Sequence, residues 1–159
     1  MRRSAGLILF AALLLSCTPA FAEKTLQTEF TTIHYSDDSY LSDFLWRITG
    51  KRLNGEATGQ LTRNRVDEIV EKVISILDMR PSPFRFDIYL EPHQSGGTIA
   101  FYSHERRAII AVYNRVTDGV LAHEIAHAVM NAYFGTVPPE KTQEILAQYV
   151  DQNLWSEVA

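Results

Sequence analysis

The sequence predicts an α+β fold in which a small mixed or mostly antiparallel sheet of about four strands packs against helices. Two observations lead to this fold class. The 159-residue chain is 46% hydrophobic and 21% charged, which is typical of one globular domain. Hydrophobic and polar residues alternate in several short segments before residue 114, whereas helical spacing dominates the segments that follow. The chain contains no internal repeat or low-complexity segment.

The first 22 residues have the features of a secretory signal peptide. Two arginines at positions 2 and 3 precede an apolar run over residues 5–15, and Ala20 and Ala22 supply the small residues of a cleavage site. The apolar run is too short to span a membrane comfortably, and no longer run follows it. We therefore expect a single exported domain over residues 23–159, secreted or periplasmic.

Net charge and cysteine content argue against two classes of function: nucleic-acid binding and metal binding by several cysteines. The formal net charge is −4 and the pI is about 5.7, which gives no basic footprint for nucleic acid. Cys17 is the only cysteine, which excludes an intrachain disulfide and a site built from several cysteines. Any metal site must therefore use histidine and carboxylate ligands. Residues 14–17 (LLSC) also resemble a lipoprotein cleavage box, so the alternative to simple export is a lipid anchor at Cys17.

The segments between residues 29 and 60 predict a strand, a helix and a loop. Residues 29–35 are rich in threonine, aromatic and β-branched side chains, as strands are. Residues 39–48 have helical hydrophobic spacing, and Gly50 follows as a stop signal. Residues 51–60 contain two glycines and an asparagine, which indicates a surface loop.

The next segments predict a longer helix, a strand and a hairpin. Apolar residues recur at helical spacing over residues 65–79, with Thr62 as the expected cap. They alternate with polar residues over 84–90, as in a half-buried strand. Residues 98–103 and 108–113 are strand-like runs joined by a charged tip, which predicts a β-hairpin.

Two helices complete the predicted fold. The first runs from about Asp118 to Tyr133 and ends at Gly135, because glycine commonly follows the last helical residue. The second begins after a pair of prolines at positions 138 and 139 and continues through Leu154. We expect the first of these helices to cross beneath the sheet.

That first helix carries the motif H-E-x-x-H at His123, Glu124 and His127. Residues four apart lie above one another on a helix face, so the two histidines can offer nitrogens to one ion. Glu124 lies about 100° further round the helix, where it can reach a water molecule activated by the ion. Zinc held in this way lowers the pKa of its water toward about 7, and a neighbouring carboxylate can accept the proton.

The alternative for this motif is an accidental pair of structural histidines. Ile125, Ala126 and Val129 make the helix apolar beside the motif, and an unpaired imidazole next to a core is costly. A bound metal explains the pair more economically. The ligand types indicate one Zn²⁺ ion, although cobalt, manganese or nickel would also bind such a site.

A hydrolytic zinc site needs a third protein ligand and an open fourth position. The pattern H-E-x-x-H-x-x-G-x-x-H is absent, because Met130 and Tyr133 stand at its glycine and last histidine positions. Glu144 follows the second histidine across a turn that can return the chain to the metal. Glu140 and Asp151 are the alternative third ligands on the same predicted helix.

The segment around Glu144, residues 143–150 (QEILAQYV), resembles the glutamate helix of the gluzincins, the thermolysin- and aminopeptidase-like zinc metallopeptidases. The resemblance covers residues 118–149 and is strongest to the minigluzincins, the single-domain members of the family. It implies a zincin-like fold and peptide hydrolysis. By resemblance, the zinc ligands are His123, His127 and Glu144, and Glu124 is the general base and acid.

Two residues depart from the gluzincin pattern. Ile145 replaces the usual glycine, and Gln148 stands where the family often has a carboxylate that accepts a hydrogen bond from a zinc-bound histidine. A glutamine carbonyl can accept that bond but adds no negative charge. Larger gluzincins take an oxyanion donor from a C-terminal subdomain, for which the resemblance to the compact minigluzincins leads us to expect no counterpart here. We assign no oxyanion donor, since neither Tyr133 nor Tyr149 is well placed for the role.

The sequence therefore predicts an exported zinc-dependent peptidase that acts on a peptide or protein substrate. The alternative is a latent or non-catalytic zinc-binding module that binds a protein or peptide partner. An edge strand of the predicted hairpin could bind such a peptide through main-chain hydrogen bonds. His34, His93 and His104 lack ligand spacing, and we expect them at the surface or in structural roles.

Overall fold

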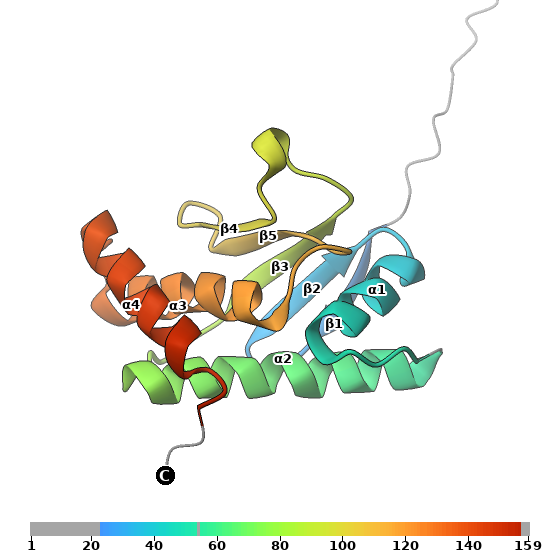
Figure 1. The fold of residues 1–159 in the computed structure, drawn as a ribbon, viewed down its shortest axis with the longest axis horizontal. Coiled ribbons are helices and arrows are strands. Elements are labelled where there is room, and N and C mark those ends of the chain that lie inside the picture. Colours follow the sequence, from blue (N-terminus) through green and yellow to red (C-terminus); the bar gives the residue numbers. More distant parts are fainter. Residues whose placement is uncertain (1–22, 54, 157–159) are drawn as a thin grey trace, which may run out of the picture.

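The computed structural model describes residues 23–53 and 55–156 and confirms the α+β class (Figure 1). The described residues form a five-stranded mixed sheet, in the order β1-β2-β3-β5-β4, and four α-helices. The strands are β1 (Lys24–Gln27), β2 (Thr31–Tyr35), β3 (Phe86–Glu91), β4 (Ala100–Ser103) and β5 (Ala108–Val112). The helices are α1 (Asp38–Thr49), α2 (Glu56–Leu77), α3 (Asp118–Phe134) and α4 (Glu140–Asn153), and a short 3-10 turn, η1 (Ser95–Gly97), lies between β3 and β4.

One face of the sheet forms the hydrophobic core with the helices. Leu26, Ile33, Ile88 and Ile109 stand side by side in register on β1, β2, β3 and β5, and all four are buried. β3 alternates buried and half-buried positions along its length, as a strand with one core-facing side does. The three central strands run parallel, and β1 and β4 are antiparallel to their neighbours. The hairpin predicted from the sequence is therefore confirmed as β4 and β5.

The sheet has one strand more than the sequence predicts, because β1 was not foreseen. β1 has only four residues (KTLQ), of which Leu26 alone is buried. Such a short segment has no hydrophobic alternation to detect, and its strand conformation depends on pairing with β2. The predicted strand over residues 29–35 is confirmed in its second half, as β2.

The predicted loop over residues 51–60 is wrong in its second half, where α2 has already begun at Glu56. Thr62 is therefore not a cap: it lies buried inside the helix, and its hydroxyl donates to the Thr58 carbonyl at 2.7 Å. Gly59, which suggested a loop, faces Leu26 of β1. Packing against the strand thus overrides the weak helix propensity of glycine at this position.

The remaining helices agree with the sequence. α1 ends at Gly50, whose φ of 70° is the left-handed conformation that glycine adopts most easily. α3 begins after Thr117, whose side chain accepts a hydrogen bond from the Val120 amide, and ends at Gly135. α4 begins after Pro139. Figure 1 shows α3 running between the sheet and α4, with α2 along the base of the molecule.

The predicted signal peptide, residues 1–22, and the alternative lipid anchor at Cys17 lie outside the described residues. Within the described residues, no helix is both long and apolar enough to cross a membrane.

Candidate metal centre

The structure brings three of the predicted ligand residues together between α3 and α4. His123, His127 and Glu144 each offer one ligand atom, and these atoms all lie within 4.8 Å of one another. The Glu144 carboxylate lies 3.6 Å from His123 Nε2 and 3.4 Å from His127 Nε2. The four-residue spacing of the histidines aligns them on the α3 face that meets α4. This group could hold a metal ion.

The second nitrogen of each histidine has a hydrogen-bond partner on α4. His123 Nδ1 lies 2.9 Å from Asp151 Oδ2, and His127 Nδ1 lies 3.2 Å from Gln143 Oε1. Because a carboxylate and an amide oxygen only accept, each Nδ1 must carry the hydrogen. In the neutral form of each imidazole, Nε2 is then the unprotonated nitrogen, and it faces Glu144. Partners of this kind hold metal-binding histidines in the correct tautomer and orientation.

Gln143 itself is held by three contacts that fix which way its amide points. Its nitrogen donates to the Pro138 carbonyl at 2.8 Å, so its oxygen is the atom that faces His127. Asn131, one turn after His127 on α3, donates to the same Gln143 oxygen at 3.0 Å and to the His127 carbonyl at 2.7 Å. Residues of α3 and of the α3–α4 turn thus hold the Gln143 oxygen beside His127.

Glu124 lies beside the potential ligands, and its carboxylate contacts the sheet. Its Oε2 accepts a hydrogen bond from the Tyr102 backbone N–H of β4 at 2.8 Å. Burial raises the pKa of Glu124 to about 7, and the nearby carboxylates of Glu144 and Asp151 add to the rise. The electrostatic interaction with His123 and the hydrogen bond from the Tyr102 N–H act in the opposite direction. A divalent cation beside Glu124 would also lower its pKa, since an opposite charge favours the ionised form.

His127 is the more deeply buried of the two histidines, with 13% of its side chain exposed against 23% for His123. Burial lowers the pKa of His127 below its ordinary value, and the hydrogen bond to Gln143 only partly opposes this. A lowered pKa keeps the imidazole neutral at physiological pH, which is the form that binds metals.

Two hollows open beside the three ligands. The turn hollow, of about 360 Å³, is bounded by β4, the end of α3 and the α3–α4 turn, and its lining includes Phe101, His104 and Val137. The start hollow, of about 410 Å³, lies at the beginning of α3 and is lined by Gly119, Val120 and Asp151 together with His123 and Glu124. His123 and Glu124 border both hollows. The two hollows therefore adjoin one another at these two residues.

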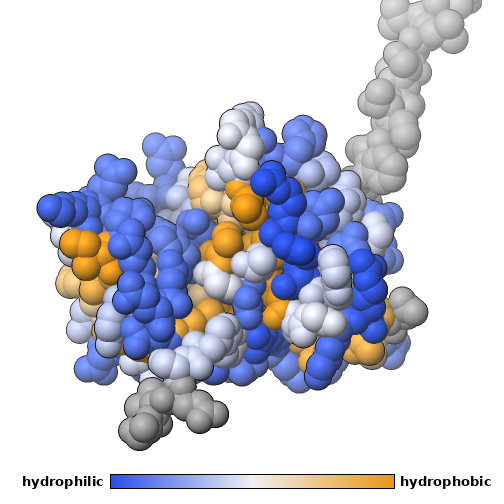
Figure 2. All heavy atoms as spheres, viewed as in Figure 1, coloured by the Kyte–Doolittle hydropathy of each residue, from blue (hydrophilic) through white to orange (hydrophobic). Residues whose placement is uncertain are grey.

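Apolar side chains are exposed around the turn hollow. Phe101 is 41% exposed on the free edge strand, and Val137 is 51% exposed in the α3–α4 turn. Figure 2 shows hydrophobic surface at the end of the molecule where Figure 1 places that turn. Tyr133 and Phe134 at the end of α3 are also half exposed.

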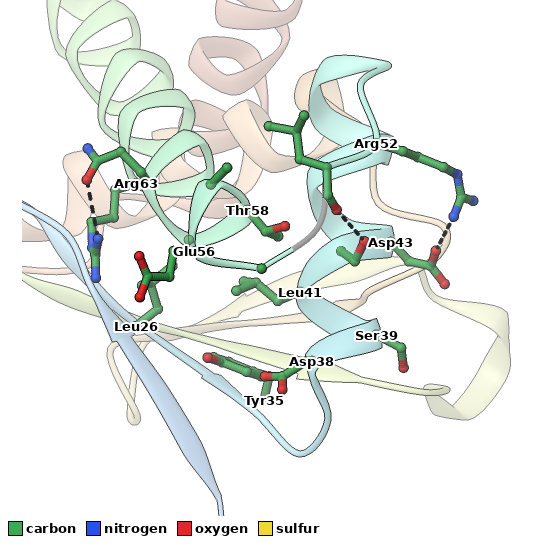
Figure 3. A pocket seen from close by; sticks show the side chains of 16 residues that line it. Leu26, Tyr35, Asp38, Ser39, Leu41, Asp43, Arg52, Glu56, Thr58 and Arg63 are labelled. Atoms are coloured by element: carbon green, nitrogen blue, oxygen red, sulfur yellow. Dashed lines mark hydrogen bonds and ion pairs between the residues drawn. The ribbon is translucent and has the colours of Figure 1, made fainter.

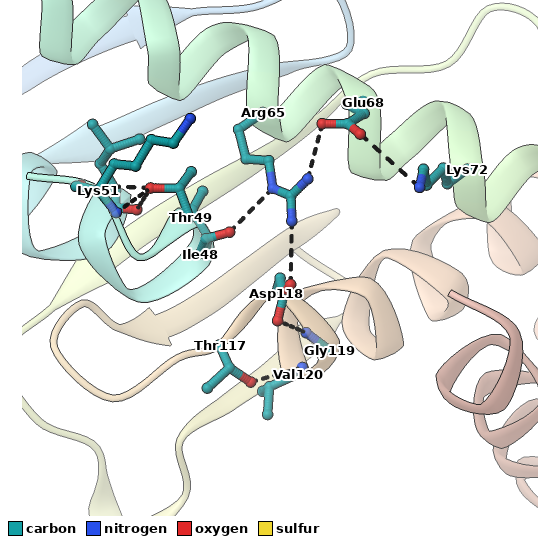
Figure 4. Close-up of polar contacts among 11 residues, drawn as sticks. Ile48, Thr49, Lys51, Arg65, Glu68, Lys72, Thr117, Asp118, Gly119 and Val120 are labelled. Carbon is teal, nitrogen blue, oxygen red and sulfur yellow. Dashed lines mark hydrogen bonds and ion pairs between the residues drawn. The ribbon is translucent and has the colours of Figure 1, made fainter. Parts of the chain in front are cut away.

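The start of α3 is tied to α2 by a network of charges (Figure 4). Arg65 of α2 donates to Asp118, the first residue of α3, at 3.2 Å and to the Ile48 carbonyl at 3.1 Å. Its guanidinium also lies 4.4 Å above the ring of Trp155, which follows α4. The helices that carry the ligands are thus both anchored to α2.

A larger cavity, of about 1000 Å³, lies away from the two hollows, between α1, the start of α2 and β1 (Figure 3). Its charged residues are mostly paired: Asp38 with Lys24 at 2.7 Å, and Asp43 with Arg52 at 3.2 Å. It contains no histidine. No group of potential metal ligands occurs there among the described residues.

The structure separates the three alternative third ligands. Glu144 joins the histidines, whereas Asp151 holds His123 Nδ1 and Glu140 is exposed and outside the group. Gln148 is exposed and makes no hydrogen bond to either histidine. Asp151, one turn further along α4, makes the contact with His123 that the gluzincin pattern assigns to the position of Gln148. The sequence could not predict this role of Asp151, because the way in which α3 and α4 cross decides which turn of α4 faces His123.

The other tyrosines and histidines considered from the sequence lie at several places in the fold. Tyr133 and Tyr149 are exposed and line neither hollow. His34 is half-buried on β2, bonded to Asp87 at 3.0 Å and stacked on Tyr89. His104 is exposed, as expected, but it lines the turn hollow, which its spacing in the sequence does not reveal.

Comparison of the chain with protein-family models, with curated proteins and with solved structures finds no match, so the candidate centre is interpreted from its own geometry.

Proposed function

We propose that this chain is an exported zinc-dependent peptidase of the gluzincin type. One observation carries the proposal: two histidines and a glutamate converge on one point, while the glutamate of the H-E-x-x-H motif lies beside them and faces the edge strand. This arrangement has the ligands and the separate base that metal-assisted hydrolysis needs.

The donor set fits a Zn²⁺ ion. Two imidazole nitrogens and one carboxylate are typical zinc ligands, and the hydrogen bonds to Asp151 and Gln143 leave both Nε2 atoms free for an ion. Co²⁺, Mn²⁺ or Ni²⁺ would suit the same donors in vitro. When bound, the ion would supply Lewis acidity, which polarises a carbonyl and makes a water molecule more acidic.

Glu124 is the proposed general base and acid. Its Oε2 is held by the Tyr102 N–H, which leaves Oε1 to accept a proton from the attacking water. The same carboxyl then donates that proton to the leaving nitrogen of the peptide bond. The partial burial that raises its pKa favours both steps, since a group that titrates near the working pH can accept and donate.

The outer edge of β4, on the side away from β5, is the proposed docking site for an extended peptide. The Val112 N–H donates to the Ile99 carbonyl at 2.8 Å, which fixes the register of the β4–β5 ladder. Because backbone groups alternate in direction along an antiparallel strand, Ala100 and Tyr102 direct theirs away from β5. Ala100 thus retains an N–H and a carbonyl for a substrate strand beside Glu124.

The test is cleavage of a diverse pool of unfolded peptides by the zinc-loaded protein, read by mass spectrometry beside the Glu124→Gln variant. We expect cuts by the wild type that the variant does not make. If neither protein cuts while both bind zinc, the peptidase proposal fails, and the alternative of a non-catalytic zinc-binding module replaces it.

A further inference from the structure

His104 lines the turn hollow together with residues of α3 and α4. It is the first residue after β4, at the tip of the β4–β5 hairpin, and it lines the hollow together with Glu124, both ligand histidines and Glu144. Its side chain is exposed. Within the part of the chain that the structure describes, its imidazole makes no hydrogen bond and no ion pair.

Most of the other donors in this hollow are already engaged. The Tyr102 N–H is bound to Glu124, and the Gln143 amide nitrogen is bound to Pro138. Asn131 Nδ2 has two acceptors. The ligand histidines direct their N–H groups to α4. His104 thus brings an unengaged N–H donor to a hollow in which these other N–H donors already have acceptors.

Peptide hydrolysis creates a need for such a donor. When water adds to the scissile carbonyl, a carbon–oxygen bond forms, the π pair of the carbonyl moves onto its oxygen, and the water proton passes to Glu124. The carbon–nitrogen bond then breaks, the pair on oxygen restores the carbonyl, and the nitrogen takes the proton from Glu124. A hydrogen-bond donor aimed at the oxygen stabilises the negative charge between these two steps.

We propose that His104 is a catalytic residue that donates its imidazole N–H to this oxyanion. The inference rests on the proposed function. An imidazole carries at least one N–H in either protonation state, so the role needs no change of charge. The His104 side chain is exposed and lines the same hollow as Glu124, next to the edge strand proposed to bind the peptide.

Tyr102 is the competing donor, because its hydroxyl also makes no hydrogen bond in the described part of the chain. Its ring, however, packs against the hydrophobic core, and burial raises the pKa of the hydroxyl. The His104 side chain is exposed at the mouth of the same hollow. Tyr102→Phe therefore serves as the direct comparison.

The experiment measures kcat and KM of the zinc-loaded protein on the best-cleaved peptide of the pool, for His104→Ala, His104→Gln, Tyr102→Phe and, as a matched control, His93→Ala. His93 is also an exposed histidine, but it lines neither hollow. Zinc affinity is measured by chelator competition for every variant. The affinity of a phosphinic analogue of that peptide, whose tetrahedral anion resembles the oxyanion, is measured by calorimetry and compared with that of the uncleavable reduced-amide analogue.

We expect His104→Ala to lower kcat about 10- to 100-fold, at or below the range of buried oxyanion donors, with KM and zinc affinity nearly unchanged. The phosphinic analogue should lose a similar factor in affinity, and the reduced amide should not. His104→Gln, which keeps an N–H donor, should recover part of kcat.

Equal kcat in His104→Ala and the wild type would overturn the inference while leaving the peptidase intact. A loss of kcat in Tyr102→Phe that exceeds the loss in His104→Ala would overturn it in favour of Tyr102. Absence of cleavage by the wild type itself would overturn the proposed function, and this inference with it.

Discussion

The two cavity-bearing regions of this molecule differ in how their charged groups are used. In the larger cavity, between α1 and α2, Asp38 and Asp43 each have a cationic partner. In the smaller region, between α3, α4 and β4, histidines and carboxylates converge without a nearby lysine or arginine partner among the described ion pairs. The difference teaches that the volume of a cavity does not indicate where potential metal ligands converge: the larger cavity has paired charges, and the smaller region has the histidine–glutamate group.

The largest expected effect is the loss of peptide cleavage in Glu124→Gln, in the smaller of the two regions. Glu124→Gln keeps the shape and the acceptor for the Tyr102 N–H but removes the proton carrier, so peptide cleavage should fall about 10²- to 10⁴-fold. Zinc affinity should change little, because Glu124 is not a ligand. Steady-state kinetics together with chelator competition measure both. A variant that cleaves at the wild-type rate would remove Glu124 from the mechanism.

Zinc affinity should distinguish the two regions most clearly when a proposed ligand is removed. His127→Ala removes one of three donors and should weaken zinc binding by more than the tenfold to hundredfold typical of a supporting hydrogen bond. Asp43→Ala, in the larger cavity, is the matched control and should bind zinc as the wild type does. Calorimetric titration with zinc gives both values. Equal affinities in the two variants would place the ion elsewhere.

The hydrogen bonds that hold the histidines should have smaller effects. Asp151→Asn retains the shape but loses the charge facing His123 Nδ1, and Gln143→Ala removes the acceptor for His127 Nδ1. Each should weaken zinc binding about 10-fold. Asp38→Asn, which breaks an exposed ion pair with Lys24, should not. If both α4 variants matched Asp38→Asn, the tautomer argument would be wrong.

The metal-free protein should lose stability as the pH rises, because of Glu124. The pKa of its carboxyl is raised from 4.5 to about 7 in the folded state, so the folded protein holds the proton more tightly than the unfolded chain between these values. Its contribution to the free energy of unfolding is therefore present below pH 4.5 and lost by about pH 7, amounting to at most about 2 kcal/mol for a half-buried group.

This pH effect is measured by urea unfolding with chelator present, at several pH values, for the wild type and Glu124→Gln. The difference between the two proteins isolates Glu124, since His127, whose lowered pKa acts in the opposite direction, is present in both. Parallel stability curves would show that Glu124 titrates normally.

The smallest effect concerns the attachment of α4 to α2. The ring of Trp155 lies 4.4 Å from the Arg65 guanidinium and 4.0 Å from the Lys72 ammonium. Trp155→Ala should lower the free energy of unfolding by about 1 kcal/mol, as for exposed cation–π contacts. The control is Trp46→Ala on α1, which removes comparable contacts with Arg47 of the same helix and with Arg52 of the segment that follows it. Only Trp155→Ala should also weaken zinc binding, because α4 carries Glu144 and Asp151.

Local patterns in the sequence predicted α1, α3, α4 and the hairpin, because their spacing and end signals are strong. They did not predict β1 or the first turns of α2, where pairing with β2 and packing of Gly59 against Leu26 decide the conformation. The spacing of His123 and His127 predicted directly that the two histidines share one face of α3 and could bind one ion. Glu144 was predicted by resemblance, but the roles of Gln143 and Asp151 depend on how α4 crosses α3, which no local pattern encodes.

The central claim is that His123, His127 and Glu144 hold one zinc ion. Anomalous diffraction from crystals of the zinc-loaded protein, recorded on both sides of the zinc absorption edge, tests it most directly. The account predicts a single ion at about 2.0–2.1 Å from both Nε2 atoms and about 2.0–2.2 Å from a Glu144 oxygen, with Glu124 outside bonding distance. An ion bound by Asp151 in place of Glu144, or no ion between α3 and α4, would contradict it.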